Sequence, residues 1–208
     1  MKKYAEILKK SQLFNGIANA DEIIKSLKIK EKTYEKGNYI YHRGDSMPCL
    51  NVVVEGKVHI IKEDYWGNTS ILTEIGVGEL FGETYACLKN IPIQVSVEAI
   101  KNSTILEIDI DSIINMGLIK NLLFVLANIN FMLTNKLEAM SQRTIRNKVM
   151  TYLSQQSQKA KNNEFDIPFN RQQLADYLSV DRSALSKEIS SMRAEGILDF
   201  NKNHFKLN

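Results

Sequence analysis

The chain has 208 residues, of which 44% are hydrophobic and 25% charged, so it is neither a disordered chain nor a small disulfide-stapled one. No apolar run reaches the roughly 18 residues of a membrane span, nothing resembles a signal peptide, and Cys49 and Cys87 form no metal-ligand cluster, so we expect a cytoplasmic protein without a membrane partner or a bound metal. The net charge of +3 divides into −1 over residues 1–141 (16 Lys and Arg against 17 Asp and Glu) and +4 over residues 142–208 (11 against 7).

The pattern of the chain changes near residue 29. Residues 1–28 have a helical pattern, with Asn19 at an N-cap position and Glu22 three residues later. From residue 29 to 110, short runs rich in Val, Ile, Tyr and Thr alternate with glycine-containing turns about every 8–12 residues, and Gly67-Asn68 is a hairpin signal. This alternation predicts an all-β barrel or roll, to which we assign residues 1–115.

A heptad pattern follows in residues 116–141. Apolar residues occupy its a and d positions, and Lys136 interrupts one d position: Ile119, Leu122, Leu126, Ile129, Leu133 and Met140. Further apolar residues widen the pattern, so that the helix has two apolar faces to bury. Because a β-roll covers only one face, we expect the other to form the interface of a homodimer. The alternative is a single core helix in a monomer.

Residues 142–208 are predicted to contain a helix at 143–161, a short strand in FDIPF, two short helices and a hairpin around residues 201–203. Asn170 is placed to cap the first short helix, with Gln173 completing a capping box, and Asp181 to cap the second. The three residues SVD between the two helices suit helices that cross steeply. The segment is therefore predicted to be a helix-turn-helix followed by a wing.

The second short helix has an outward face suited to DNA. Leu185 and Ile189 face inward, which leaves small and cationic residues on the other side: Arg182, Ser183, Ser186, Lys187 and Ser190. Small residues let a helix approach the floor of the major groove, and cations reach base edges and phosphates. Five of the six arginines also lie after residue 141, and the planar guanidinium binds two acceptors at once. The alternative is the solvated face of an ordinary helical hairpin.

Five motifs follow one another along the chain: Lys36-Gly37, Gly44-Asp45, Gly56, Phe81-Gly82-Glu83 and the stretch 170–198. In their order and spacing they resemble the Crp/Fnr family of transcription regulators over nearly the whole chain. The resemblance implies an α+β fold with an N-terminal β-roll of the double-stranded β-helix or jelly-roll type, a long dimerisation helix and a C-terminal winged helix-turn-helix. It also implies a regulator that senses a signal in the roll, binds a near-palindromic site in double-stranded promoter DNA and works with RNA polymerase.

The resemblance assigns roles within the helix-turn-helix. The phosphate-contacting position of the family matches Arg171, with Gln172 beside it, and the base-reading positions match four residues of the second helix: Arg182, Ser183, Ser186 and Lys187. Many members have glutamate where this chain has Ser183, and arginine where it has Lys187. Serine lacks the reach with which a glutamate accepts from cytosine N4, so the commonest half-site of the family is not carried over.

The resemblance also locates an effector pocket in the roll, with five residues: Phe81, Gly82, Glu83, Thr84 and Val95. In the cyclic-nucleotide members, the segment matching FGE cradles the phosphate, a glutamate holds the ribose hydroxyl and a later arginine neutralises the phosphate. Here Ile93, Gln94 and Val95 stand near the place of that arginine, so Arg43 or Lys89 would have to replace it. Because a buried phosphate without a cation is costly, we expect that cyclic AMP is not the effector.

Other cofactors and activities are weighed in the same way. Two cysteines cannot supply the four ligands of an iron–sulfur cluster. Haem stays open, although each candidate axial ligand is more simply structural: His42, His59, Cys87 and Met132. No HExxH, GxSxG or paired-carboxylate pattern predicts an enzyme. The sequence therefore predicts a homodimeric DNA-binding transcription regulator with an unknown effector; the alternatives are an effector-binding protein of the same fold that acts through protein contacts, and a haem-based gas sensor.

Overall fold

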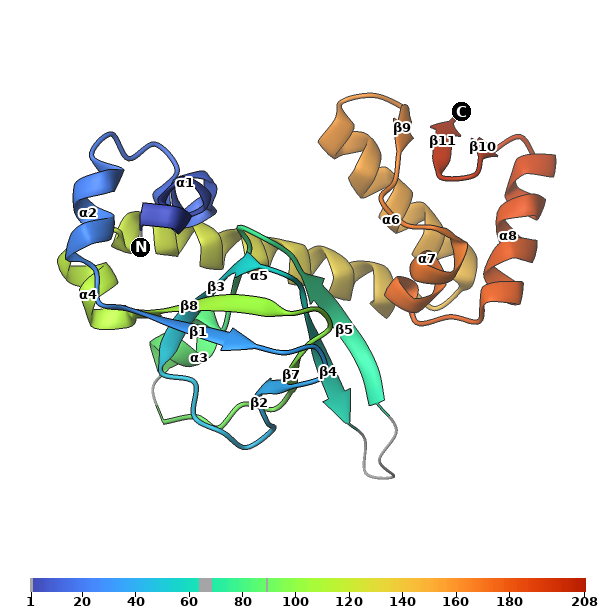
Figure 1. Cartoon of the computed structure of the whole chain (residues 1–208). Coiled ribbons are helices and arrows are strands. Elements are labelled where there is room, and N and C mark those ends of the chain that lie inside the picture. Colours follow the sequence, from blue (N-terminus) through green and yellow to red (C-terminus); the bar gives the residue numbers. More distant parts are fainter. Residues whose placement is uncertain (1, 64–68, 89) are drawn as a thin grey trace. The chain divides into compact units, whose positions relative to one another are not determined.

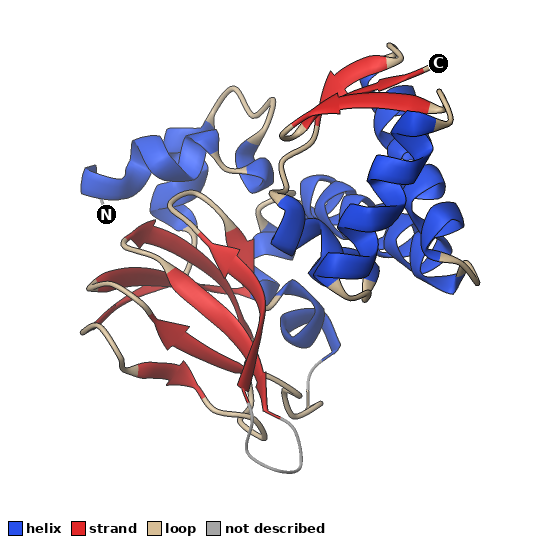
Figure 2. Cartoon of the chain, turned by 90° about the vertical axis from the view of Figure 1, so that its right-hand side faces the viewer, coloured by secondary structure: helices blue, strands red, loops and turns tan. Residues whose placement is uncertain are grey.

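The computed structural model describes residues 2–63, 69–88 and 90–208, and the chain folds into two compact units, residues 1–127 and 128–208. A long helix, α5 (Ile119–Ser141), begins in the first unit and ends in the second. The first unit carries the two larger sheets, and the second carries the helix-turn-helix and a small sheet (Figures 1 and 2). The predicted α+β fold, with a β-roll, a long helix and a winged helix-turn-helix, is confirmed.

The first unit is built from two antiparallel four-stranded sheets, in the orders β1-β8-β3-β6 and β2-β7-β4-β5. Its strands are β1 (Ile29–Tyr34), β2 (Tyr39–Tyr41), β3 (Cys49–Glu55), β4 (Val58–Glu63), β5 (Thr69–Ile75), β6 (Leu80–Phe81), β7 (Ser96–Ala99) and β8 (Ser103–Asp109). Its helices before α5 are η1 (Lys2–Tyr4), α1 (Ala5–Lys10), η2 (Gln12–Phe14), α2 (Ala20–Ser26), α3 (Glu83–Leu88) and α4 (Ile110–Asn115). The predicted hairpin signal Gly67-Asn68 lies outside the described residues.

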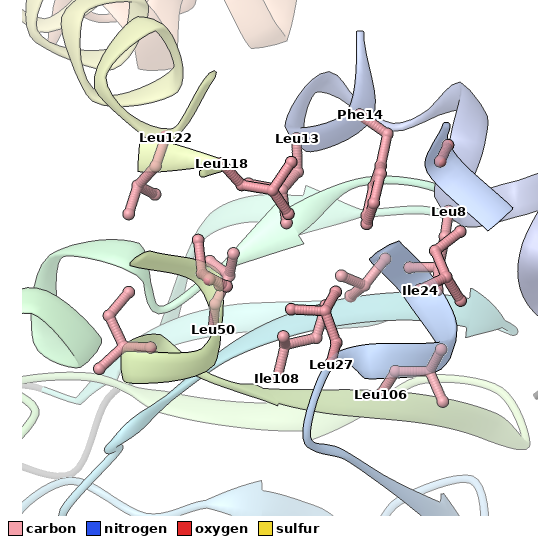
Figure 3. Packing of buried hydrophobic residues seen from close by; sticks show 14 of the residues in the cluster. Leu8, Leu13, Phe14, Ile24, Leu27, Leu50, Leu106, Ile108, Leu118 and Leu122 are labelled. Carbon is pink, nitrogen blue, oxygen red and sulfur yellow. The ribbon is translucent and has the colours of Figure 1, made fainter. Parts of the chain in front are cut away.

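Two apolar clusters hold this unit together. One joins the amino-terminal helices, the β1–β8–β3 sheet and the start of α5, where Leu118 and Leu122 pack with Leu13 and Leu50 (Figure 3). The other joins strand residues of both sheets, Phe81 among them, with the loop residues Met47 and Ile93. These three residues are at most 3% exposed. Burial of these side chains is the main driving force for folding of the unit.

The second unit contains α6 (Ile145–Ala160), β9 (Glu164–Asp166), α7 (Arg171–Leu178), α8 (Arg182–Ala194), β10 (Leu198–Asn201) and β11 (His204–Leu207). The three strands form an antiparallel sheet in the order β10-β11-β9. Its core is made by fully buried residues of the three helices and the wing: Val149, Leu153, Leu174, Leu178, Leu185, Ile189, Met192 and Phe205. The predicted helix-turn-helix and its wing therefore surround one apolar centre.

Local capping explains where these helices begin. Asn170 and Gln173 form the predicted capping box in both directions, and Asp181 accepts from the Ala184 amide at the start of α8. Both predicted caps are confirmed, and a cap of this kind stabilises a helix by about 1 kcal/mol. At α2 the prediction is wrong in part, because Asn19 is the N-cap residue but its side chain makes no capping hydrogen bond.

Candidate nucleic-acid interface and effector region

The turn between α7 and α8 depends on a left-handed residue. Ser179 has φ 51° and ψ 58°, in a position where many such turns have glycine. This conformation costs a residue with a side chain about 1–2 kcal/mol. The turn is held by the Val180 amide, which donates to the carbonyl of Ala175, and by Lys148 Nζ, which donates to the carbonyl of Leu178 at 3.1 Å. The start of α8 is thus fixed by contacts within the second unit.

The first turn of α8 is organised by Asp181. Its Oδ1 accepts from the Ser183 hydroxyl at 2.6 Å and from the Ala184 amide at 2.9 Å. These bonds, that of Ser183 first, hold the pKa of Asp181 below its ordinary value. Because Ser183 donates its proton to the cap, its oxygen faces outward chiefly as an acceptor.

The outward face of α8 presents two free cations. Arg182, Ser183 and Lys187 are exposed, and Ser186 is half-buried. Within the described residues, neither Arg182 nor Lys187 forms an ion pair, whereas Arg146 is bound by Glu188 and Glu195. The structure therefore brings the four predicted base-reading residues together on one helix face, with its cations uncommitted.

Arg171 is engaged by the wing rather than free. Its guanidinium lies over the rings of Phe200, at 5.0 Å, and Phe205, at 5.5 Å, and Nη2 donates to the carbonyl of Lys202 at 3.4 Å. Burial lowers its pKa from the ordinary value. The predicted phosphate-contacting residue is therefore also part of the joint between α7 and the wing hairpin.

The sequence analysis assigned no role to Phe200 and Phe205. The register of β10 and β11 places these two residues directly opposite each other. The alternation of apolar residues in this hairpin was the available signal. Gln172, the other predicted backbone contact, is exposed but donates along α7 to Asp176 at 2.8 Å.

The predicted dimer residues do not all lie on one accessible face of α5. Leu122 is 1% exposed within the core of the first unit, so it cannot contact a second chain, and this part of the prediction is wrong. Leu126, Ile129 and Met140 are half-buried, and Ile119 and Leu133 are 50% and 60% exposed. The large apolar residues that α5 exposes beyond the predicted set are Leu123, Phe124, Phe131, Met132 and Leu137.

Four of the five predicted effector residues lie in the turn where β6 leads into α3. Phe81 is buried, Gly82 has φ 82°, Glu83 begins α3, and Thr84 is exposed. The half-buried Val95 belongs to the following segment, in which the Gln94 amide donates to the Tyr85 hydroxyl at 3.3 Å.

The place expected for a phosphate cation is filled by apolar side chains. Ile93 is fully buried and its backbone is bonded to Gly44 and Asp45. A Cβ at Gly82 would collide with the sulfur of Met47, so the backbone there lies directly on the packed interior. Neither Ile93 nor Met47 could neutralise an anion at this turn.

Glu83 forms no ion pair with any of the described residues. Its Oε2 is buried without a hydrogen-bond partner among the described residues, and desolvation raises the pKa of the carboxyl above its ordinary value. Of the two substitute cations, Arg43 is exposed and its amide donates to the Ser96 hydroxyl, while Lys89 lies outside the described residues.

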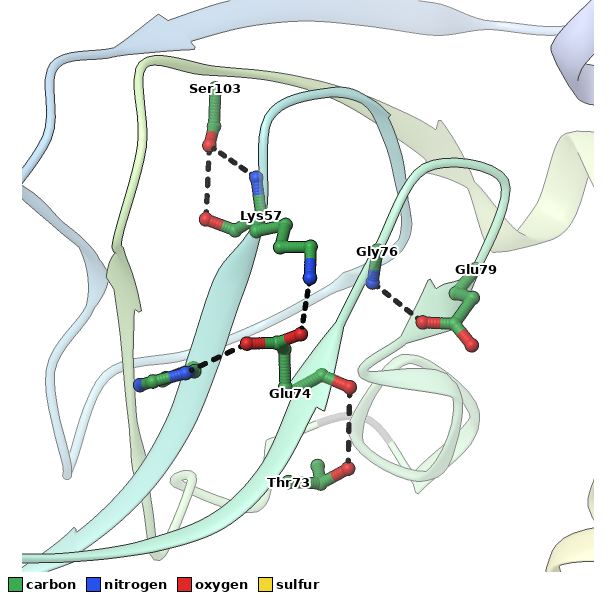
Figure 4. A network of polar contacts seen from close by, with 7 residues as sticks. Lys57, Thr73, Glu74, Gly76, Glu79 and Ser103 are labelled. Atoms are coloured by element: carbon green, nitrogen blue, oxygen red, sulfur yellow. Dashed lines mark hydrogen bonds and ion pairs between the residues drawn. The ribbon is translucent and has the colours of Figure 1, made fainter. Parts of the chain in front are cut away.

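The candidate haem ligands do not form a haem site. His59 Nε2 lies 3.3 Å from Glu74, a carboxylate that also accepts from Lys57 (Figure 4), and the ring of His42 stacks on Tyr39. Cys87 and Met132 are exposed. Two surface cavities, of about 480 and 370 Å³, contain none of these four residues. The residues present therefore do not fit a haem.

No helix in the described part of the chain combines the length and apolarity that a membrane span requires. Among these same residues, no group of three or more His, Cys, Asp or Glu side chains converges on a point where a metal ion could bind.

Comparisons with known proteins agree with this two-part architecture. A family model described as a cyclic nucleotide-binding domain matches residues 31–117, and one described as a Crp-like helix-turn-helix domain matches residues 147–208. A cyclic AMP receptor protein from Thermus thermophilus is 25% identical over 198 residues, which cover 92% of this chain and 89% of the relative.

Solved structures show the same fold. CprK in complex with OCPA is similar with a TM-score of 0.62 and 15% identity, over 92% of this chain and 89% of that one. FixK2 from Bradyrhizobium japonicum is similar with a TM-score of 0.52 and 22% identity, over 88% and 93%.

The roll, the long helix and the exposed face of α8 define a DNA-binding regulator with a domain of the cyclic nucleotide-binding type. The chain belongs to the Crp/Fnr family of transcription regulators.

Proposed function

We propose that the protein is a homodimer that binds a specific, near-palindromic DNA site by placing α8 in the major groove. The observation that carries this proposal is the outward face of α8, where Arg182 and Lys187 are exposed and unpaired among the described residues. Ser183 and Ser186 between them are small enough for the helix to approach the groove closely. RNA polymerase is the expected protein partner of such a regulator.

The contacts divide by position in the motif. Arg182 stands in the first turn of α8, where its fork can bind guanine O6 and N7, and Ser183 and Lys187 lie on the same face. Arg171 and Gln172 begin α7, the helix that crosses the DNA backbone in this motif. We therefore assign base reading to α8 and backbone contact to the start of α7.

Salt dependence tests this function directly. Binding to a promoter fragment should weaken steeply with salt. Arg171→Ala should flatten the log–log slope, since each lost phosphate contact removes about 0.9 from it, whereas Arg182→Ala combined with Lys187→Ala should weaken binding by removing base contacts. Arg143→Ala is the matched control, because Arg143 is exposed in the same unit but lies outside α8. Salt-insensitive or absent binding would contradict the proposal and favour a protein-binding role.

We further infer that the signal sensed by the roll is not cyclic AMP. The Thermus relative is named for cyclic AMP, but this chain has the buried Ile93 near the place of the phosphate-binding arginine.

Isothermal titration with millimolar cyclic AMP tests the inference about the signal. We expect no saturable heat from protein that binds promoter DNA in the same buffer. A dissociation constant in the micromolar range would contradict the inference, and loss of that binding in Arg43→Ala would identify the substitute cation.

A further inference from the structure

Two series of residues repeat every seven positions along α5. The first series contains Ile119, Leu126, Leu133 and Met140, and the second contains Leu123, Asn130 and Leu137. Alternating steps of four and three residues keep both series on one side of a helix with a 3.5-residue period, as in paired helices. Four of these side chains are 50–68% exposed: Ile119, Leu123, Leu133 and Leu137.

The other side of the helix is already occupied by the chain itself. Leu122 and Val125 are buried in the first unit, and Ala139 is buried in the second. Lys136, which would interrupt a series based on Leu122 and Ile129, has its Nζ 5.2 Å from the ring centroid of Tyr177. A pattern that contains Leu123 in place of Leu122 therefore avoids Lys136. The two series together form an apolar stripe that contains no charged residue.

The stripe suits a second copy of the chain. Its exposed aliphatic residues offer on the order of 500 Å² per helix, so a pair of helices would bury about 1,000 Å², close to the smallest area expected of a specific interface. A heptad spacing also matches only another helix of the same period, which the same helix of a second copy provides.

We propose that Asn130 of one copy pairs with Asn130 of a second copy and fixes the register of a parallel α5 pair; this rests on the homodimer of the proposed function. Asn130 is the polar member in the middle of the stripe. An amide donates and accepts, so two of them satisfy each other. A slip of one heptad would bury Asn130 against Leu123 or Leu137 with its amide unpaired.

Cross-linking of the full chain tests the pairing. In a Cys49→Ser, Cys87→Ser background, Asn130→Cys should form an intermolecular disulfide at least tenfold faster than Asn128→Cys. Asn128 is a matched control, since it is exposed on α5 but belongs to neither series. Equal rates for the two variants would overturn the register.

Asn130→Leu provides a test that keeps both native cysteines. We expect native mass spectrometry to show species larger than dimers and a dimer dissociation constant at least tenfold lower, with weaker DNA binding from misaligned pairs, whereas Asn128→Leu should behave as wild type. A single dimer with unchanged dissociation would overturn the role of Asn130 alone. A monomeric wild type would overturn the homodimer as well.

Discussion

The two units differ in the exposure of the residues that stand at or near the functional positions of the family. On α8, three of the four residues that we propose to read DNA are exposed, and among the described residues Arg182 and Lys187 form no ion pair. In the roll, Ile93 stands near the place of the phosphate-binding arginine and is fully buried among apolar side chains. An exposed residue can be substituted without a change in its neighbours. Substitution of a buried residue requires the side chains packed against it to change as well. The proposed DNA-binding residues can therefore be compared with the family one by one, and the proposed effector residues cannot.

The largest expected effect tests whether the two units are independent. Leu106 and Leu185 are both fully buried, one in each unit. Leu106→Ala and Leu185→Ala should each lower the free energy of unfolding of their own unit by about 2–5 kcal/mol, because each leaves a cavity. Hydrogen exchange measured by mass spectrometry should show faster exchange in that unit alone. Equal destabilisation of both units by either variant would break the comparison.

A smaller effect separates the two roles of Arg171. Arg171→Ala should lower the free energy of unfolding of the second unit by about 1–2 kcal/mol, since it removes the contacts with Phe200 and Phe205. Arg171→Lys keeps the charge but loses the planar stack, so we expect reduced stability with an unchanged salt slope of DNA binding. Thermal unfolding and titration at several salt concentrations measure the two effects. Wild-type stability in both variants would restrict Arg171 to phosphate contact.

A substitution in the turn before α8 should raise the stability of the second unit rather than lower it. Ser179→Gly should raise the free energy of unfolding of the second unit by about 1 kcal/mol, because glycine adopts the left-handed conformation without strain. Ser191→Gly, within α8, should have the opposite sign, since glycine weakens a helix interior. Chemical denaturation compares the two variants. A loss of stability in Ser179→Gly would show that the serine side chain makes a contact that stabilises the unit by more than the backbone strain destabilises it.

The smallest effect concerns the wing sheet and pH. His204 has Nε2 3.1 Å from Glu164 and Nδ1 3.1 Å from Asp166, and only an imidazolium donates to both. These bonds, that of Glu164 first, raise the pKa of His204 above its ordinary 6.5. Their contribution should therefore be complete below pH 6.5 and be lost as pH rises through the raised pKa.

We expect the melting temperature of the wild type to fall over that pH range by more than the melting temperature of His204→Gln. The difference should be small because both side chains of the ion pair are exposed. His204 lines the surface cavity of about 370 Å³, whose other charged residues include Lys206, Asp199 and Arg193, so the variant is needed to isolate His204. An identical pH profile in the variant would remove His204 as the cause.

The local elements were predictable because their determinants are local. The capping box of Asn170 and Gln173 and the cap of Asp181 depend on residues three positions apart, and both were placed from sequence. For the apolar stripe of α5 the sequence alone does not decide, because a heptad based on Leu122 and one based on Leu123 differ by a single residue. Only the tertiary burial of Leu122 separates them. The stacking of Arg171 on the wing was missed for the same reason, since α7 and the wing hairpin are distant in sequence.

Selection of binding sites from randomised duplexes, compared between wild type, Arg182→Ala and Ser183→Glu, tests the central claim that α8 reads sequence. The wild type should select a near-palindrome with half-sites about one helical turn apart. Arg182→Ala should cost about 1–3 kcal/mol per half-site and abolish the preference at one base pair, and Ser183→Glu should shift a neighbouring position towards cytosine. A selected sequence that is unchanged in both variants would contradict the claim.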